Sequence, residues 1–109
     1  MNITKIYHTA IICSDYAASK TFYTEVLGLT VIAEHYRTER ESYKLDLALN
    51  GDYVIELFSF PNPALRPSRP EATGLRHLAF QVPDIDTAIA WLNKNQVATE
   101  PVRIDEFTG

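Results

Sequence analysis

The alternation of apolar and polar positions near the start of the chain predicts a strand followed by a helix. Residues 3–13 are rich in Ile, Tyr and Thr, a composition that favours a strand. Asp15 can then cap a helix that runs to Leu27, and Gly28 is suited to end it.

Three further strands are expected before residue 61. Residues 30–37 and 43–49 have the composition of strands, and the dipeptide Asn50-Gly51 is typical of a tight hairpin turn. That turn leads into a strand over residues 53–60. The predicted order of this part is therefore β-α-β-β-β.

A proline-rich stretch interrupts the pattern, and the β-α-β order then restarts. Residues 61–73 contain four prolines, which disfavour regular structure and predict an extended connector. A strand is expected over residues 75–82, a helix capped by Asp84 after it, and a strand over residues 98–104. We expect a single domain made of a first module over residues 1–60, a connector over 61–73 and a second, incomplete module over 74–109.

An internal repeat supports two modules. The pattern His-x-Ala-x4-Asp begins at His8 and again at His77, an offset of 69 residues that also aligns Phe22 with Trp91. The coincidence of this match with the same predicted elements favours duplication over chance. The same offset places the counterparts of the hairpin and of the fourth strand beyond residue 109, so the second module is expected to lack its last two strands.

Composition and charge narrow the class of protein. With 109 residues and 46% hydrophobic residues, the chain suits one compact domain. A formal net charge of −4 disfavours nucleic acid and anionic membrane surfaces as partners. The single cysteine, Cys13, excludes an intramolecular disulfide, and the first residues lack a signal-peptide pattern, so we expect a cytoplasmic protein.

Two histidines and a glutamate are the candidate metal ligands. The repeat places His8 and His77 on the side of their strands opposite the apolar, helix-covered face, and Glu56 has apolar neighbours on its strand. Because a buried carboxylate needs a compensating cation, a divalent ion such as Zn, Ni, Fe or Mn is one explanation. The alternative is that both histidines are ordinary strand residues and that Glu56 pairs with Arg76 or Lys44.

Two other residues are interpreted as structural. Asp46 could lie on the same concave side of the sheet as these candidate ligands, but pairing with Lys44 or Arg37 is the favoured role. Cys13 falls on the helix-facing side of its strand, so it is expected to belong to the core.

At these residues the chain resembles the vicinal oxygen chelate superfamily, also called the glyoxalase and bleomycin-resistance fold. The segments that carry the resemblance are IYHTAIICSDYAASKTFYTEVLGL, DLALNGDYVIELFSF and GLRHLAFQVPDID. It implies an α+β fold in which two tandem βαβββ modules form a cupped mixed sheet around a metal. His8, Glu56 and His77 fall on three of the four ligand positions, and the fourth would lie near position 125, beyond this sequence.

Three functions remain open. The first is a metal-dependent lyase or isomerase of the glyoxalase type, acting on a small substrate with adjacent oxygens such as a hemithioacetal, with Glu56 as a ligand or acid-base group. The second is a non-haem iron dioxygenase of the extradiol type, which the same ligands would serve. The third is a metal-free ligand-binding protein of the bleomycin-resistance kind. Because an incomplete module leaves an unpaired sheet edge, we also expect a homodimer.

Overall fold

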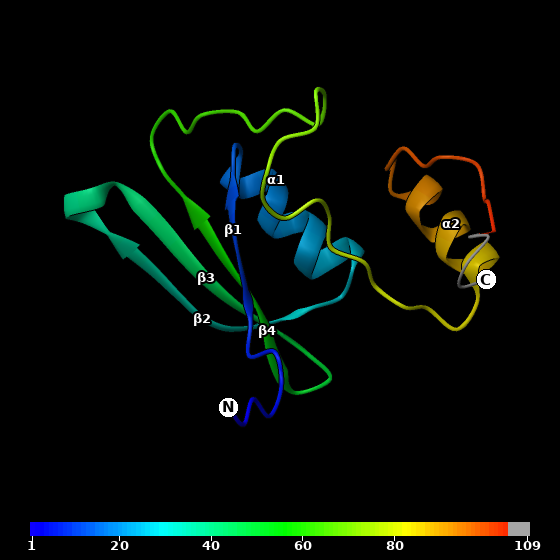
Figure 1. The fold of residues 1–109 in the computed structure, drawn as a ribbon, viewed down its shortest axis with the longest axis horizontal. Coiled ribbons are helices and arrows are strands. Elements are labelled where there is room, and N and C mark those ends of the chain that lie inside the picture. Colours follow the sequence, from blue (N-terminus) through cyan, green and yellow to red (C-terminus); the bar gives the residue numbers. More distant parts are fainter. Residues whose placement is uncertain (105–109) are drawn as a thin grey trace. The chain divides into compact units, whose positions relative to one another are not determined.

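A computed structural model describes residues 1–104 of the chain (Figure 1). The chain divides into two compact units, one over Met1–Arg76 and one that begins at His77. None of the helices within the described residues combines the length and apolar character that crossing a bilayer requires.

The first unit begins with the expected strand and helix. Strand β1 covers Thr9–Cys13 and helix α1 covers Tyr16–Thr21, continuing as a π-helical turn, η1, over Phe22–Val26. The Asp15 side chain accepts a hydrogen bond from the Ala18 N–H at 3.1 Å, which confirms the predicted cap.

Three more strands complete this unit. They are β2 (Thr30–Arg37), β3 (Ser42–Leu49) and β4 (Asp52–Ser59), with a short 3₁₀ turn, η2 (Thr38–Arg40), between β2 and β3. Asn50 and Gly51 have φ angles of 51° and 86°. Positive φ at both positions is the signature of a type I′ turn, so the predicted hairpin is confirmed.

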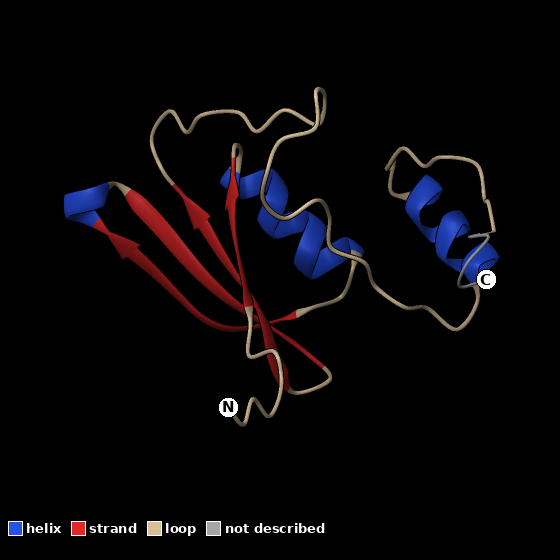
Figure 2. Cartoon of the chain, viewed as in Figure 1, coloured by secondary structure: helices blue, strands red, loops and turns tan. Residues whose placement is uncertain are grey.

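The four strands form one mixed sheet in the order β1-β4-β3-β2, with β1 parallel to β4 and the other pairs antiparallel (Figure 2). One face of this sheet carries the core, in which Tyr16 and Tyr23 of the helical segment pack against buried side chains of the strands. The buried cluster consists of Cys13, Leu29, Leu45, Leu47, Ile55 and Leu57. The expectation that Cys13 belongs to the core is therefore confirmed.

The first strand is shorter than the sequence suggested. Its ladder with β4 begins at the pair Thr9 and Ile55, so residues 3–8 have no strand partner and form no regular structure. As a result His8 lies one residue before β1 rather than within it.

The second unit contains one helix among its described residues. Helix α2 covers Ile85–Lys94, and the Asp84 carboxylate accepts hydrogen bonds from the Asp86 N–H at 3.1 Å and the Thr87 hydroxyl at 2.7 Å, which confirms the second predicted cap. The strands expected over residues 75–82 and 98–104 are not formed. A strand is stable only when a neighbour completes its hydrogen bonds, and the described part of this unit supplies none.

Candidate functional site

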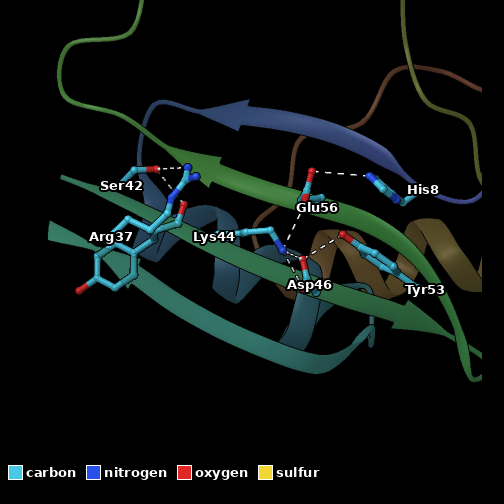
Figure 3. A network of polar contacts seen from close by, with 8 residues as sticks. His8, Arg37, Ser42, Lys44, Asp46, Tyr53 and Glu56 are labelled. Carbon is cyan, nitrogen blue, oxygen red and sulfur yellow. Dashed lines mark hydrogen bonds and ion pairs between the residues drawn. The ribbon is translucent and has the colours of Figure 1, made fainter. Parts of the chain in front are cut away.

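The open face of the sheet, opposite the core, brings together two of the three predicted ligands. The side chains of His8 and Glu56 approach to 3.6 Å between Nε2 and Oε1 (Figure 3). Their side chains keep only 28% and 16% of their surface exposed, so the pair is largely withdrawn from water. Glu56 faces this way because Ile55 and Leu57, its neighbours on β4, are both in the core.

A chain of polar contacts continues from the other oxygen of Glu56. Lys44 Nζ lies 3.2 Å from Glu56 Oε2 and donates to both carboxylate oxygens of Asp46, at 2.8 and 2.9 Å. The Tyr53 hydroxyl donates to Asp46 Oδ1 at 2.9 Å (Figure 3). The predicted pairing of Asp46 with Lys44 is thus confirmed, and Lys44 is also the residue that contacts Glu56.

The charges of this network do not cancel. One ammonium, from Lys44, stands against two carboxylates, from Asp46 and Glu56. Burial raises the pKa of Asp46, but hydrogen bonds from Lys44 and Tyr53 outweigh it, so the pKa lies below its usual value. The Asp46 contact raises the pKa of Lys44. Both groups are therefore charged at neutral pH, and Lys44 is shared between the Asp46 and Glu56 carboxylates.

Aromatic rings enclose His8. The Tyr53 ring stacks on the imidazole with centroids 4.7 Å apart and an interplanar angle of 16°, and Tyr7 meets it edge-on at 4.9 Å. His8 Nδ1 is buried without a hydrogen-bond partner among the described residues. The imidazole is therefore held in place mainly by the two rings rather than by hydrogen bonds.

The position of Tyr53 corrects an expectation from strand alternation. Strict alternation puts Tyr53 on the same side as Ile55 and Leu57, in the core. The β3–β4 register shifts between Leu47 and Ala48, so Ala48 pairs with Tyr53 while Leu47 pairs with Ile55. The extra residue, Val54, packs against the core instead, and Tyr53 turns to the open face.

The donor set at His8 and Glu56 fits a divalent ion in chemistry and spacing. Two ligands bound to one ion at about 2.0–2.2 Å each lie about 3.0–3.5 Å apart, close to the 3.6 Å between Nε2 and Oε1. A second cation beside two carboxylates that share one ammonium would also balance the charges of the network. Lys44 is the competing partner, because it already holds Oε2.

The third predicted ligand lies in the other unit. His77 is the first residue of the second unit, exposed and outside helix or strand. Within residues 1–104, no three His, Cys, Asp or Glu side chains are gathered closely enough to hold a metal ion together. The set of His8, Glu56 and His77 therefore stays a prediction.

Sequence comparisons identify close relatives of this chain. A model of the Glyoxalase/Bleomycin resistance protein/Dioxygenase superfamily matches residues 5–109. YwkD of Bacillus subtilis (strain 168), an uncharacterized protein, is 60% identical over all of this chain and 85% of its own length. YaeR of Escherichia coli (strain K12), also uncharacterized, is 57% identical over 99% of this chain and 84% of its own length.

The fold also matches a solved structure. The glyoxalase family protein from Enterococcus faecalis superposes with a TM-score of 0.91 at 48% identity, covering 100% of this chain and 86% of that one. This likeness confirms the predicted α+β class, with the four-stranded mixed sheet as one half of the fold.

Proposed function

This chain belongs to the glyoxalase/bleomycin resistance/dioxygenase superfamily, and we propose that it is a metal-dependent lyase or isomerase acting on a small substrate with adjacent oxygens. A hemithioacetal is the substrate type that we favour. One observation carries the proposal: a neutral imidazole nitrogen and a carboxylate oxygen can meet one ion at the 3.6 Å separation of His8 and Glu56.

In this proposal His8, Glu56 and His77 hold a divalent ion, which is Zn, Ni, Fe or Mn. When bound, such an ion supplies Lewis-acid stabilisation of negative charge that develops on adjacent substrate oxygens. Imidazole and carboxylate are ligands that all four metals accept, so the residues favour none of them.

Glu56 has a second role in this proposal, as the acid-base group. Lys44 holds its Oε2 at 3.2 Å, so Oε1 would serve both roles: it would bind the ion, and it would take or return a proton only when released from the ion. Asp46 fixes Lys44 with two hydrogen bonds, and Tyr53 fixes Asp46 with one. The chain of contacts therefore fixes the orientation of Glu56 and limits its rotation between the two oxygens.

The proposal is tested by elemental analysis of the purified protein, followed by turnover of candidate hemithioacetals after each metal is removed and restored. We expect activity to depend on one of the four metals and to be lost in Glu56→Gln. Activity that survives complete removal of metal would contradict the proposal. Activity restored by iron alone, with consumption of oxygen, would favour the dioxygenase instead.

His77→Ala tests the third ligand. Loss of a direct ligand should abolish turnover and weaken metal binding by more than the roughly 10 to 100-fold typical of residues that only support a ligand. The fold should survive because His77 is exposed and outside regular structure. Metal content, turnover and circular dichroism measure the three effects, with Cys13→Ala as a control that should keep its activity. Full metal occupancy in His77→Ala would show that His77 is not a ligand.

A second candidate is a metal-free ligand-binding protein, which the Lys44 contact favours. Lys44 already gives Glu56 a cationic partner at 3.2 Å, so the carboxylate is partly compensated without an ion. In that case the open face would bind a small molecule through hydrogen bonds and the rings of Tyr7 and Tyr53. Protein that retains no metal after purification and binds none on titration would select this candidate.

We also propose that the chain forms a homodimer. In the first unit β1 and β2 are the edge strands of the sheet, and exposed edges are sites of association. Analytical ultracentrifugation at micromolar concentration should give about twice the monomer mass of 12.3 kDa, and a single species at the monomer mass would contradict the proposal.

A further inference from the structure

Two arginines lie on aromatic rings at the end of the open face. Arg37 closes β2, and its Cζ lies 5.4 Å from the centroid of the Phe58 ring. Arg40, in the turn η2, lies 5.3 Å from the Phe60 centroid. The two phenylalanine rings stack on each other, with centroids 5.9 Å apart. Each ring of a stacked aromatic pair at the end of β4 therefore carries one guanidinium group.

Neither guanidinium has a carboxylate partner among the described residues. Four cations of the described chain, Lys20, Lys44, Arg69 and Arg103, are paired with acids. Lys5, Arg66, Arg76 and Lys94 make no ion pair among the described residues either, so the absence of a carboxylate partner alone does not single out Arg37 and Arg40. Glu39 and Glu41 flank Arg40 in sequence, but both are exposed and neither makes an ion pair with it or with Arg37. Two positive charges without a carboxylate partner among the described residues favour an anion locally, against the net charge of −4 of the whole chain.

The hydrogen bonds of Arg37 are also incomplete. A guanidinium has five N–H donors, and Arg37 uses one of them, from Nη2 to the buried Ser42 hydroxyl at 3.4 Å (Figure 3). Its Nε is buried and has no hydrogen-bond partner within residues 1–104. Native proteins rarely leave a buried donor of a charged group unsatisfied, so Arg37 keeps hydrogen-bonding capacity that the described residues do not use.

Arg37 lies over a ring on the same face of the sheet as Glu56. Phe58 lies two residues after Glu56 on β4, hence on the same face, at about 7 Å along the strand. Lys44 pairs with Phe58 in the β3–β4 register, which places Phe58 beside the polar network. Arg37, which lies over the Phe58 ring, is therefore placed on the same face as Glu56 and further along β4.

We propose that Arg37, assisted by Arg40, is an anion-binding subsite that recognises a carboxylate or phosphate group of the substrate. This inference rests on the proposed function in one respect, namely that the substrate binds on the open face of the sheet. It narrows the substrate class to acids that carry an anionic group in addition to the adjacent oxygens. The planar guanidinium suits both anions because it can donate two parallel hydrogen bonds.

The test follows the side-chain Nε–H signals of arginine by ¹⁵N nuclear magnetic resonance while inorganic phosphate, and separately acetate, is added to the purified protein. We expect the Arg37 signal to shift and saturate with at least one of these anions. Arg37→Gln should weaken binding about tenfold or more, because a charged, two-point contact is lost. Arg37→Lys keeps the positive charge but not the planar pair of donors. Its affinity for the anion should therefore lie between those of the unaltered protein and Arg37→Gln.

Two variants and one treatment make the result decisive. Arg103→Gln removes the same charge from an exposed site in the second unit and should bind as the unaltered protein does. Arg40→Gln should weaken binding less than Arg37→Gln, and it keeps the test valid if Arg37→Gln fails to fold. Saturable binding before and after treatment with a chelator would support the subsite even if metal-dependent turnover is never found. The absence of an Arg37 shift with both anions, or equal binding by Arg37→Gln and Arg103→Gln, would overturn the proposal.

Discussion

The two faces of the four-stranded sheet are built from the same strands and have opposite chemistry. On the covered face Leu45, Leu47 and Leu57 keep no exposed surface. On the open face Lys44, Asp46 and Glu56 alternate with them and form one network of ion pairs. Because strand residues point alternately to the two sides, a single segment such as β3 contributes to both.

The difference between the faces separates stability from chemistry. Burial of apolar side chains is worth about 1.5–3 kcal/mol for each large residue, and it accumulates on the covered face. Paired charges that are partly buried contribute much less, because the cost of removing them from water offsets their attraction. The open face can therefore carry groups that bind a ligand without contributing much to stability, while the covered face stabilises the fold.

The largest effect on stability should come from the covered face. Leu57→Ala removes a fully buried side chain and should lower the free energy of unfolding by about 2–5 kcal/mol. Urea denaturation followed by circular dichroism measures the change. The matched variant on the open face is Ile12→Ala. Because Ile12 is 59% exposed, this change should lower the free energy of unfolding by less than about 1 kcal/mol. Equal losses in the two variants would break the distinction between the faces.

Lys44→Met should separate stability from metal binding. Removal of the ammonium leaves Asp46 and Glu56 without their shared cation, so the free energy of unfolding should fall by about 1–2 kcal/mol in metal-free protein. Affinity for a divalent ion should rise several-fold, because a competing positive charge is gone. Denaturation and metal titration on the same samples measure both. A loss of metal affinity would show that Lys44 is needed to position Glu56 for the ion.

The smallest effect is a dependence of stability on pH at the edge of the covered face. Hydrogen bonds from Lys20 and Tyr16 hold the pKa of Glu34 below its usual value. A carboxylate whose pKa is lower in the folded protein stabilises it above the unfolded pKa of about 4.3, and this contribution is lost as pH falls through the folded pKa. For a pair this exposed it is less than about 1 kcal/mol.

Glu34→Gln should remove that contribution. The variant should be slightly less stable than the unaltered protein at pH 7, and the two stabilities should converge as the pH is lowered below about 4. Denaturant midpoints across the pH range measure the difference. A difference in stability between the two proteins that is the same at pH 3 and pH 7 would show that Glu34 acts through packing rather than charge.

Much of the fold could be read from local signals in the sequence. The caps at Asp15 and Asp84 and the turn at Asn50-Gly51 depend on short-range chemistry, so the pattern alone identified them. The strands expected over residues 75–82 and 98–104 were wrong for the described chain, because strand formation depends on a partner that no local pattern supplies.

The candidate site was predicted in part, for a related reason. The proximity of His8 and Glu56 followed from the repeat and from strand alternation. Tyr53 was missed as a neighbour of His8, because a bulge one residue away reverses the alternation and carries no clear signal in the sequence. Arg37 was considered only as a partner of Asp46, and its position over Phe58 depends on the path of the β2–β3 turn.

X-ray absorption spectroscopy of the metal-loaded protein tests the central claim most directly, because it identifies the atoms around the ion. The account predicts nitrogen or oxygen ligands at about 2.0–2.2 Å, with the outer-shell scattering of two imidazole rings from His8 and His77. His8→Gln and His77→Ala should each remove one ring from that signal, and Glu56→Gln should remove none. An ion surrounded by oxygen ligands with no imidazole scattering, or a spectrum that neither histidine variant changes, would contradict the claim that the open face is a metal site.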